Sequence, residues 1–275
     1  MSSPPDAPAE QSPGGSQGTD EDRASLEARN LVRTFGPVRA VDGVTFRVEV
    51  GELLTIFGPN GAGKSTLLNL LAGAMRPTAG EIRMGGRLRS HGEVEWRRGV
   101  GILSHQTFLY DPLTAAENLR FYGRLFGVPS LDDRIQERLE AVGLASRRDD
   151  PVRGFSRGMR QRLALARTLL HDPEVVLLDE PYTGLDVHAA ALLRDLLSSL
   201  KDGRRTVVLV THDLTQGMEL ADRVAIQVAG RFAFHDAVEG LPEGPMDSFY
   251  RDVVEGALGG GGSGGIAAAE RTGPR

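Results

Sequence analysis

Two short stretches of the chain carry side chains that could act together on a polyphosphate. The first, GPNGAGKST at 58–66, matches the pattern G-x-x-x-x-G-K-[ST] and lies between an apolar run, LLTIF, and a helical pattern, TLLNLLAG. Glycines let main-chain N–H groups approach phosphate closely, and the start of a helix adds a favourable partial charge. We therefore predict that Lys64 reaches the β- and γ-phosphates and that Ser65 binds Mg²⁺. The residues predicted to bind nucleotide are Gly58, Pro59, Asn60, Gly61, Ala62, Gly63, Lys64, Ser65 and Thr66.

The second stretch, VVLLDEP at 175–181, ends in two adjacent carboxylates. Asp179, at the end of an apolar run, could hold Mg²⁺ through water, and Glu180 could orient and polarise an attacking water. Such a pair taken alone is more often a solvated turn. Together with the phosphate loop, it indicates hydrolysis of a phosphoanhydride.

Two further polar residues follow apolar runs. Gln106 comes after VGILSH and His212 after TVVLVT. Gln106 could contact Mg²⁺ or the attacking water, and His212 could contact the γ-phosphate. For either residue taken alone, a capping glutamine or a hydrogen-bonded core histidine is the simpler interpretation.

The composition excludes several other kinds of site. The 275 residues include no cysteine, which excludes disulfides, zinc–thiolate sites and covalent haem attachment. A net charge of -5 and a pI near 5.7 argue against a nucleic-acid partner. No apolar run approaches the roughly 18 residues that span a bilayer, and the N-terminus lacks the apolar stretch of a secretory signal. We therefore expect a soluble chain in the cytoplasm.

The elements that must position these residues alternate between strands and helices. Near-continuous apolar runs such as VVLLDEP and TVVLVTH are typical of strands buried on both faces. The alternation predicts an α/β fold with a mainly parallel sheet, whose ligands bind at the carboxyl ends of the strands. Strands are predicted at 53–58, 100–105, 175–181 and 206–212, and helices at 63–73, 114–127, 131–144, 157–171 and 186–201.

Several regions depart from this alternation. Helices follow one another from about 110 to 170, which predicts an inserted helical subdomain, and NLVRTF and VTFRVEV predict an antiparallel edge layer. Residues 1–26 are rich in Pro, Ser and Gly and predict a disordered tail. Residues 241–275 form a C-terminal extension in which GALGGGGSGG is interpreted as a glycine linker. The predicted folded domain is 27–240.

The motifs stand in a recognisable order. After the phosphate loop come Gln106, a helix start at Ser156-Arg157-Gly158, Asp179-Glu180, GLD at 184–186 and His212. This order resembles the nucleotide-binding domain of ATP-binding-cassette (ABC) transporters over about residues 27–240. The resemblance implies a three-layer P-loop NTPase core that binds ATP with Mg²⁺ and hydrolyses it to drive transport. Glu180, His212 and Gln106 would be catalytic, and Ser65, Gln106 and Asp179 would hold the metal.

The resemblance also implies a dimer. In this family the helix that starts at Ser156 points at the γ-phosphate of ATP held by the other subunit, so Ser156 and Gly158 would complete a site in trans. Asp186 would lie at the dimer seam, and Phe35 would stack on adenine, with a buried core phenylalanine as the alternative. The chain departs from the family's usual Leu-Ser-Gly-Gly-Gln by reading FSRGM, with Arg157 and Met159 in place of glycine and glutamine.

The same resemblance implies multi-span membrane permease subunits as partners and a peripheral place on the cytoplasmic face of a bacterial inner membrane. A second, identical nucleotide-binding subunit is expected. The segments HQTFLYDPLTAAENL and FSRGMRQRLALAR most resemble the ATP-binding subunit of the haem exporter of cytochrome c maturation. An exporter of drugs, lipids or polysaccharides, and a soluble ATPase without a transport role, are the alternatives.

Overall fold

The computed structural model describes residues 25–89 and 94–259. Its central sheet has six strands in the order β10-β9-β3-β8-β7-β6, of which only the β9–β10 pair is antiparallel. Every residue of β3, β7 and β8 is buried, as their apolar runs predict. The strands are β3 Leu53–Phe57, β6 Val100–Leu103, β7 Val175–Asp179, β8 Thr206–Val210, β9 Arg223–Val228 and β10 Arg231–Ala237.

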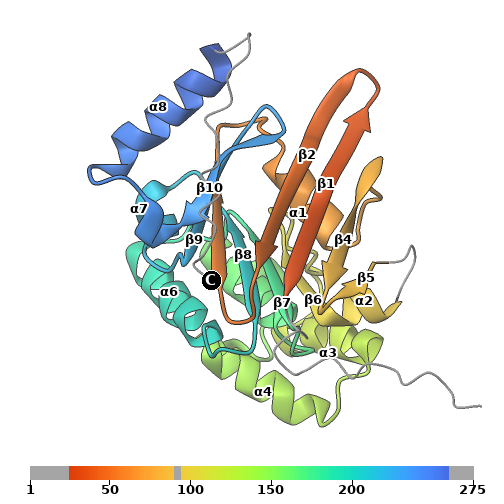
Figure 1. The fold of residues 1–275 in the computed structure, drawn as a ribbon. Helices are drawn as coiled ribbons and strands as arrows, with labels where there is room; N and C mark the ends of the chain where they lie inside the picture. Colours follow the sequence, from red (N-terminus) through yellow and green to blue (C-terminus); the bar gives the residue numbers. More distant parts are fainter. Residues whose placement is uncertain (1–24, 90–93, 260–275) are drawn as a thin grey trace, which may run out of the picture.

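A second, antiparallel sheet covers one face of the first, in the order β2-β1-β4-β5. Figure 1 shows its long β1–β2 hairpin beside the central strands. Helix α1 (Lys64–Leu71) lies between the sheets, because its leucines share one apolar cluster with Leu26, Val48 and Val208. This sheet confirms the predicted edge layer and extends it by two strands. Its strands are β1 Leu26–Phe35, β2 Val38–Val48, β4 Ala79–Met84 and β5 Arg87–Leu88.

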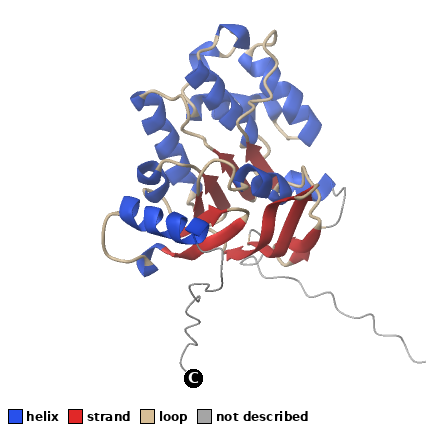
Figure 2. Ribbon diagram, turned by 90° about the horizontal axis from the view of Figure 1, so that it is seen from above, coloured by secondary structure: helices blue, strands red, loops and turns tan. Residues whose placement is uncertain are grey.

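Helices cover the opposite face of the central sheet and build the helical subdomain (Figure 2). Helices α5 and α6 pack on the sheet, and α3, α4 and α5 share a separate apolar cluster. Helix α3 begins with a capping box in which Thr114 and Glu117 exchange hydrogen bonds. The predicted subdomain and all five predicted helices are confirmed, each end lying within a few residues. The helices are α2 Val94–Gly99, α3 Ala115–Phe126, α4 Leu131–Ala141, α5 Arg157–Thr168, α6 Val187–Leu200 and α7 Leu214–Met218, with short 3-10 turns at Ala145–Arg147, Val152–Gly154 and Val238–Gly240.

The first residues of the predicted glycine linker belong to a helix. Helix α8 (Met246–Gly259) packs across β9 and β10, and it contains the residues 256–259 that were assigned to the glycine linker. The assignment of residues 256–259 to a linker is therefore wrong. The apolar residues Phe249 and Val253 lie one helical turn apart and pack α8 on the sheet, which carries the helix on into the glycines. At the other end, β1 already begins at the buried Leu26, inside the predicted tail. Residues 1–24 and 260–275 of the predicted tails lie outside the described residues.

Within the described part of the chain, none of the helices combines the length and the apolar character needed to cross a bilayer.

The packing of α8 leads to a test of its contribution to stability. Phe249 meets Phe234 of β10 edge to face, with ring centroids 4.9 Å apart, and is half-buried. We expect Phe249→Ala to lower the free energy of unfolding by about 2 kcal/mol, below the roughly 3–5 kcal/mol of a fully buried phenylalanine. Urea unfolding followed by circular dichroism measures this. Leu258→Ala, on the exposed side of the same helix, is the matched control; equal effects would contradict the packing role of α8.

Candidate nucleotide site

The predicted site residues gather at one edge of the central sheet. Strands β3, β6, β7 and β8 run parallel, so their carboxyl ends meet at the same edge. The phosphate loop follows β3, Gln106 lies just beyond β6, Glu180 follows β7, and His212 lies just beyond β8. This is the edge at which α/β sheets bind their ligands.

The phosphate loop requires glycine at both of its ends. Gly58 and Gly63 have φ values of 154° and 102°, which side chains rarely adopt. A Cβ on Gly58 would lie 2.2 Å from the main-chain oxygen of Gln227, and one on Gly63 would lie 1.9 Å from that of Ala40. The strands behind the loop therefore leave room for main chain only. Gly61, whose φ is 80°, faces open space.

Lys64 is the first residue of α1 and is buried against the loop. Its Nζ donates hydrogen bonds to the main-chain oxygens of Gly58, at 2.7 Å, and Pro59, at 3.1 Å. Burial lowers the pKa of Lys64, while the nearby carboxylates of Glu180 and Asp179 raise it. Burial is the larger effect, so the pKa of Lys64 is lowered overall, and the two main-chain oxygens hold the ammonium group at the loop.

Asp179 is the buried last residue of β7. Burial raises its pKa, and a hydrogen bond from the Ser65 hydroxyl lowers it. The structure therefore brings together a hydroxyl and a carboxylate that the sequence places more than a hundred residues apart. Oxygen ligands of this kind suit Mg²⁺.

Glu180 and His212, both predicted as catalytic, form a direct pair. Glu180 Oε1 lies 2.8 Å from His212 Nδ1, and its Oε2 accepts a hydrogen bond from the Thr211 hydroxyl at 3.1 Å. Glu180 has a φ of 49°, a left-handed conformation that is uncommon for a residue with a side chain. The side chain of Glu180 is 25% exposed, so water can reach it. Sequence reasoning missed Thr211, whose only signal is its place beside His212.

Gln106 lies in the exposed segment beyond β6. Its main-chain oxygen accepts a hydrogen bond from Ser104 at 2.8 Å, but within residues 25–89 and 94–259 no hydrogen bond joins its side chain to Asp179 or Glu180. The structure therefore does not bring Gln106 into contact with the carboxylates. The neighbouring His105, which sequence reasoning did not select, is close enough to Asp179 to lower the pKa of that carboxyl.

Ser156, Gly158 and Asp186 form a second group at two helix starts. Ser156 caps α5 by accepting a hydrogen bond from Met159 N at 3.2 Å, and Asp186 caps α6 through Ala189 N at 2.8 Å. In the described ranges, no hydrogen bond or ion pair links this group to residues 58–66. The chain thus carries two separate groups of predicted site residues.

Arg157 lies against the loop that leads to Asp186. A Cβ on Gly184, whose φ is 78°, would lie 2.4 Å from Arg157 Nε. The arginine that departs from the family pattern therefore packs on Gly184 within its own subunit, and Gly184 makes room for it.

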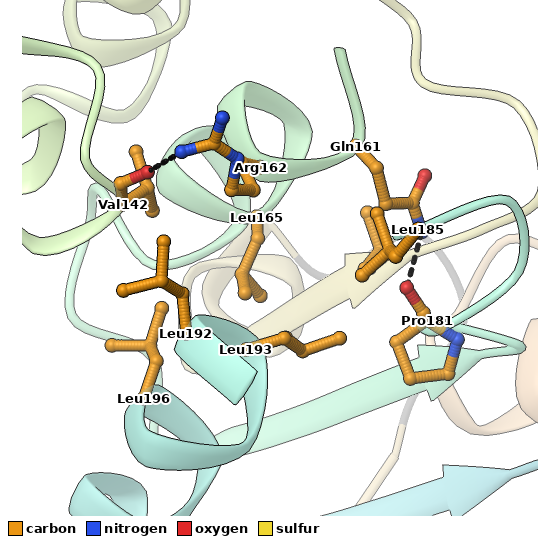
Figure 3. Close-up of a pocket in the computed structure, with 10 residues that line it drawn as sticks. Val142, Gln161, Arg162, Leu165, Pro181, Leu185, Leu192, Leu193 and Leu196 are labelled. Atoms are coloured by element: carbon orange, nitrogen blue, oxygen red, sulfur yellow. Dashed lines mark hydrogen bonds between the residues drawn. The ribbon is translucent and has the colours of Figure 1, made fainter. Parts of the chain in front are cut away.

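Helix α5 is also joined to the segment after Glu180 (Figure 3). Gln161 Nε2 donates to the main-chain oxygen of Pro181 at 3.1 Å, and Arg162 Nη1 donates to that of Val142 at 2.8 Å. The two bonds flank a small apolar pocket, which is a packing seam between the subdomain and the core rather than a nucleotide site. Its other lining residues are Leu103, Leu165, Leu185, Leu192, Leu193 and Leu196.

Phe35 ends β1 and is 44% exposed, so it is not the buried core residue of the alternative interpretation. The Arg33 guanidinium stands over its ring, 4.6 Å from the centroid. Strand β2, which follows directly, passes behind the phosphate loop at Ala40. The ring is thus an accessible flat surface on the strand pair next to the loop.

Known proteins share these features. The family model described as ABC transporter matches residues 41–183. The ABC transporter ATP-binding protein NatA of Bacillus subtilis (strain 168) is 37% identical over 75% of this chain and 85% of its own length. Nod factor export ATP-binding protein I of Cupriavidus metallidurans is 36% identical over 84% of this chain and 76% of its own. The spermidine/putrescine import protein PotA of Pseudomonas aeruginosa is 36% identical over 83% and 64%, respectively.

Solved structures agree with the fold. An ATP-binding subunit of an ABC transporter has a TM-score of 0.77 at 28% identity, covering 83% of this chain and 98% of that one. A dimeric ATP-binding cassette in a post-hydrolysis state, bound to ADP and Pi, has a TM-score of 0.71 at 27% identity, covering 78% of this chain and all of its own. The three relatives above do not include a haem exporter by name, so the narrower resemblance gains no support from them. Because the family model spans half of the chain and meets both the phosphate loop and the strand-end carboxylates, the chain belongs to the ABC transporter family, as an ATP-binding and ATP-hydrolysing subunit.

Proposed function

We propose that this chain powers a membrane exporter by hydrolysing Mg-ATP at residues 58–66 and the facing strand ends. The observation that carries the proposal is the Glu180–His212 pair, with Oε1 and Nδ1 2.8 Å apart, at the same sheet edge as Lys64 and Asp179. Such an arrangement places a base, a cation and a metal-binding carboxylate around one phosphate-binding loop.

The residues fit Mg²⁺ as a companion of the nucleotide. Within the described residues no group of three His, Cys, Asp or Glu could hold a metal ion alone. Ser65 would supply an oxygen ligand and Asp179 would hold the ion through water, and Mg²⁺ commonly takes its other ligands from phosphates and water. When bound, the ion would neutralise charge on the phosphates. Gln106 is proposed as a further ligand that reaches the site from the segment beyond β6.

Each remaining residue has a role that follows from its contacts. The Glu180 carboxylate only accepts hydrogen bonds when ionised, so His212 Nδ1 and the Thr211 hydroxyl donate to it and orient it. Glu180 is the proposed general base for the attacking water. Lys64 would exchange its loop carbonyl partners for the β- and γ-phosphates, and Phe35 would stack on adenine.

A second copy of the chain is proposed to complete each site. Ser156 is exposed and Gly158 half-buried at the start of α5, and in the described part of the chain neither has a hydrogen bond to the phosphate loop of its own subunit. A helix start with free N–H groups is suited to an anion, and the γ-phosphate held by the partner subunit supplies one. The dimeric relative bound to ADP and Pi supports this arrangement, with Asp186 at the seam.

Multi-span permease subunits are proposed to bind the aromatic patch beyond Gln106. This patch consists of the exposed Phe108, Tyr110, Phe121 and Leu125. Exposed apolar side chains gathered in this way mark an interaction surface. The chain would then be held peripherally at the cytoplasmic face of the membrane. A soluble ATPase without such partners is the competing function.

The names of the relatives differ in the direction of transport. The Nod factor relative is named for export and PotA for import, at equal identity. Export is proposed because the Nod factor relative is named for export and because HQTFLYDPLTAAENL and FSRGMRQRLALAR resemble segments of an exporter subunit. Haem as the cargo is supported by the resemblance of these two segments. We therefore propose an exporter ATPase in general, with haem as one cargo to be tested.

Glu180→Gln tests both the base and the dimer. The variant keeps the side-chain shape and acceptor oxygen but loses the base, so hydrolysis should fall at least about 100-fold while Mg-ATP binding remains. ATP should then hold two copies together, which size-exclusion chromatography with light scattering detects. Lys64→Ala, which removes the phosphate contact, should give neither binding nor dimer.

A Glu180→Gln variant that stays monomeric with ATP at all concentrations would contradict the site completed in trans. The same ATP-bound variant, used as bait in native membranes, should retain multi-span proteins. Proteins of cytochrome c maturation would identify haem export, a different permease would assign another cargo, and soluble partners alone would contradict the membrane role.

Arg157→Gly tests the unusual helix start. Because Arg157 packs on Gly184 and opposes the helix dipole by no more than about 1 kcal/mol, the variant should bind ATP normally and change hydrolysis less than about tenfold. Steady-state ATPase assays measure this, with Arg153→Ala as a control that removes a nearby charge. Complete loss of hydrolysis would show instead that Arg157 contacts phosphate.

A further inference from the structure

Gln227 is a fully buried amide in β9, where the other buried residues are Val224, Ala225, Ile226 and Val228. It lies near the carboxyl end of β9, and none of its surface is exposed. Within residues 25–89 and 94–259, neither its Nε2 nor its Oε1 has a hydrogen-bond partner. Buried amides without partners are rare because their desolvation is not repaid. A leucine or methionine would fill the same position without this cost, so the amide needs an explanation.

The phosphate loop lies directly against Gln227. The main-chain oxygen of Gln227 lies 2.2 Å from the place that a Cβ on Gly58 would take. Its side-chain Nε2 lies 3.0 Å from the place of a Cβ on Gly63. Gln227 therefore borders both ends of the loop, and its amide stands behind Gly63, the residue just before α1.

Neighbouring groups show that the back of this loop is a hydrogen-bonding surface. Gly230, in the turn after β9, donates its N–H to the main-chain oxygen of Ala62 at 2.9 Å, and its own oxygen accepts from Asp42 N at 2.9 Å. The main-chain oxygen of Ala40 approaches Gly63 from β2. The amide of Gln227 is the unpaired member of this set.

The loop's own hydrogen bonds must change when phosphate binds. Lys64 Nζ now donates to the main-chain oxygens of Gly58 and Pro59. A lysine that turns to phosphate leaves both oxygens without that donor. When the N–H groups of a loop point inward at an anion, its peptide oxygens tend to point outward. The outward side of this loop is where Gln227 holds two N–H donors and one acceptor.

We propose that Gln227 is a positioning residue for the phosphate loop, whose carboxamide hydrogen-bonds the loop main chain in the nucleotide-bound state. The inference rests on the proposed nucleotide site at residues 58–66. Among residues 25–89 and 94–259 the amide has no partner, which costs stability; with nucleotide bound, new hydrogen bonds to the loop would favour the bound arrangement. Gln227 touches neither ATP nor the reacting water and acts through the loop alone.

Gln227→Met separates this role from a merely structural one. Methionine has a similar length and fills the space but offers no N–H group. We expect the free variant to melt at the same temperature as the wild type or higher, and to bind Mg-ADP about fivefold more weakly, the size of one net hydrogen bond. The KM for ATP should rise similarly with little change in kcat, because binding alone is affected. Differential scanning calorimetry and isothermal titration calorimetry with the full chain measure both.

A matched control removes another buried polar atom away from the loop. His235 Nε2, on β10 beside the rings of Phe46 and Phe232, is also buried without a partner in the described residues. His235→Leu should leave Mg-ADP affinity unchanged. If Gln227→Met binds Mg-ADP as tightly as the wild type, or if the free variant melts at a lower temperature, the proposal is wrong. Lys64→Ala reports separately on the site itself: unchanged binding there would refute the nucleotide site and not only the role of Gln227.

Discussion

The whole site depends on how closely two strands approach the phosphate loop from behind. The main-chain oxygens of Ala40 on β2 and Gln227 on β9 occupy the space that side chains on Gly63 and Gly58 would need. The loop therefore cannot move back toward these strands, and only glycine fits at the two positions. The antiparallel sheet is therefore part of the site: β2 supplies one of these oxygens, and α1 is clamped between the two sheets.

Burial and charge work against each other in the same small volume. Burial raises the pKa of Asp179 and lowers that of Lys64, so it disfavours the charged form of each. Each charge opposes the effect of burial on the other. Added phosphate would bring negative charge next to Asp179, which a divalent cation would counter. The left-handed backbone of Glu180, at a φ of 49°, places its carboxylate toward His212 and Thr211, and such strain is typical of functional positions.

The sequence could predict what depends on local pattern. A continuous apolar run predicts a buried strand, and the structure has β7 and β8 where such runs occur. The glycine-rich motif predicts a loop followed by a helix, and α1 begins there. What depends on packing between distant segments could not be predicted. Gln227 interrupts a strand pattern without any motif, and its place behind the loop arises only when β9 pairs with β3. Helix α8 was missed because glycines dominate its end, although Phe249 packs on β10.

Helix α5 connects the parts of the molecule that the proposed cycle must coordinate. Its first turn carries Ser156 and Gly158, and its second carries Gln161, which holds the main-chain oxygen of Pro181 just after Glu180. Near its end the buried Arg167 donates to Ile102 of β6 at 3.0 Å, and its guanidinium lies 5.6 Å from the ring centroid of Phe108 in the aromatic patch. A helix is stiff along its axis, so a displacement of its start by the partner's nucleotide would reach both the hydrolytic strand end and the patch. Arg157, which differs from the usual glycine of the family, is the first residue of this helix. Its contact with Gly184 also joins α5 to the loop that leads to Asp186.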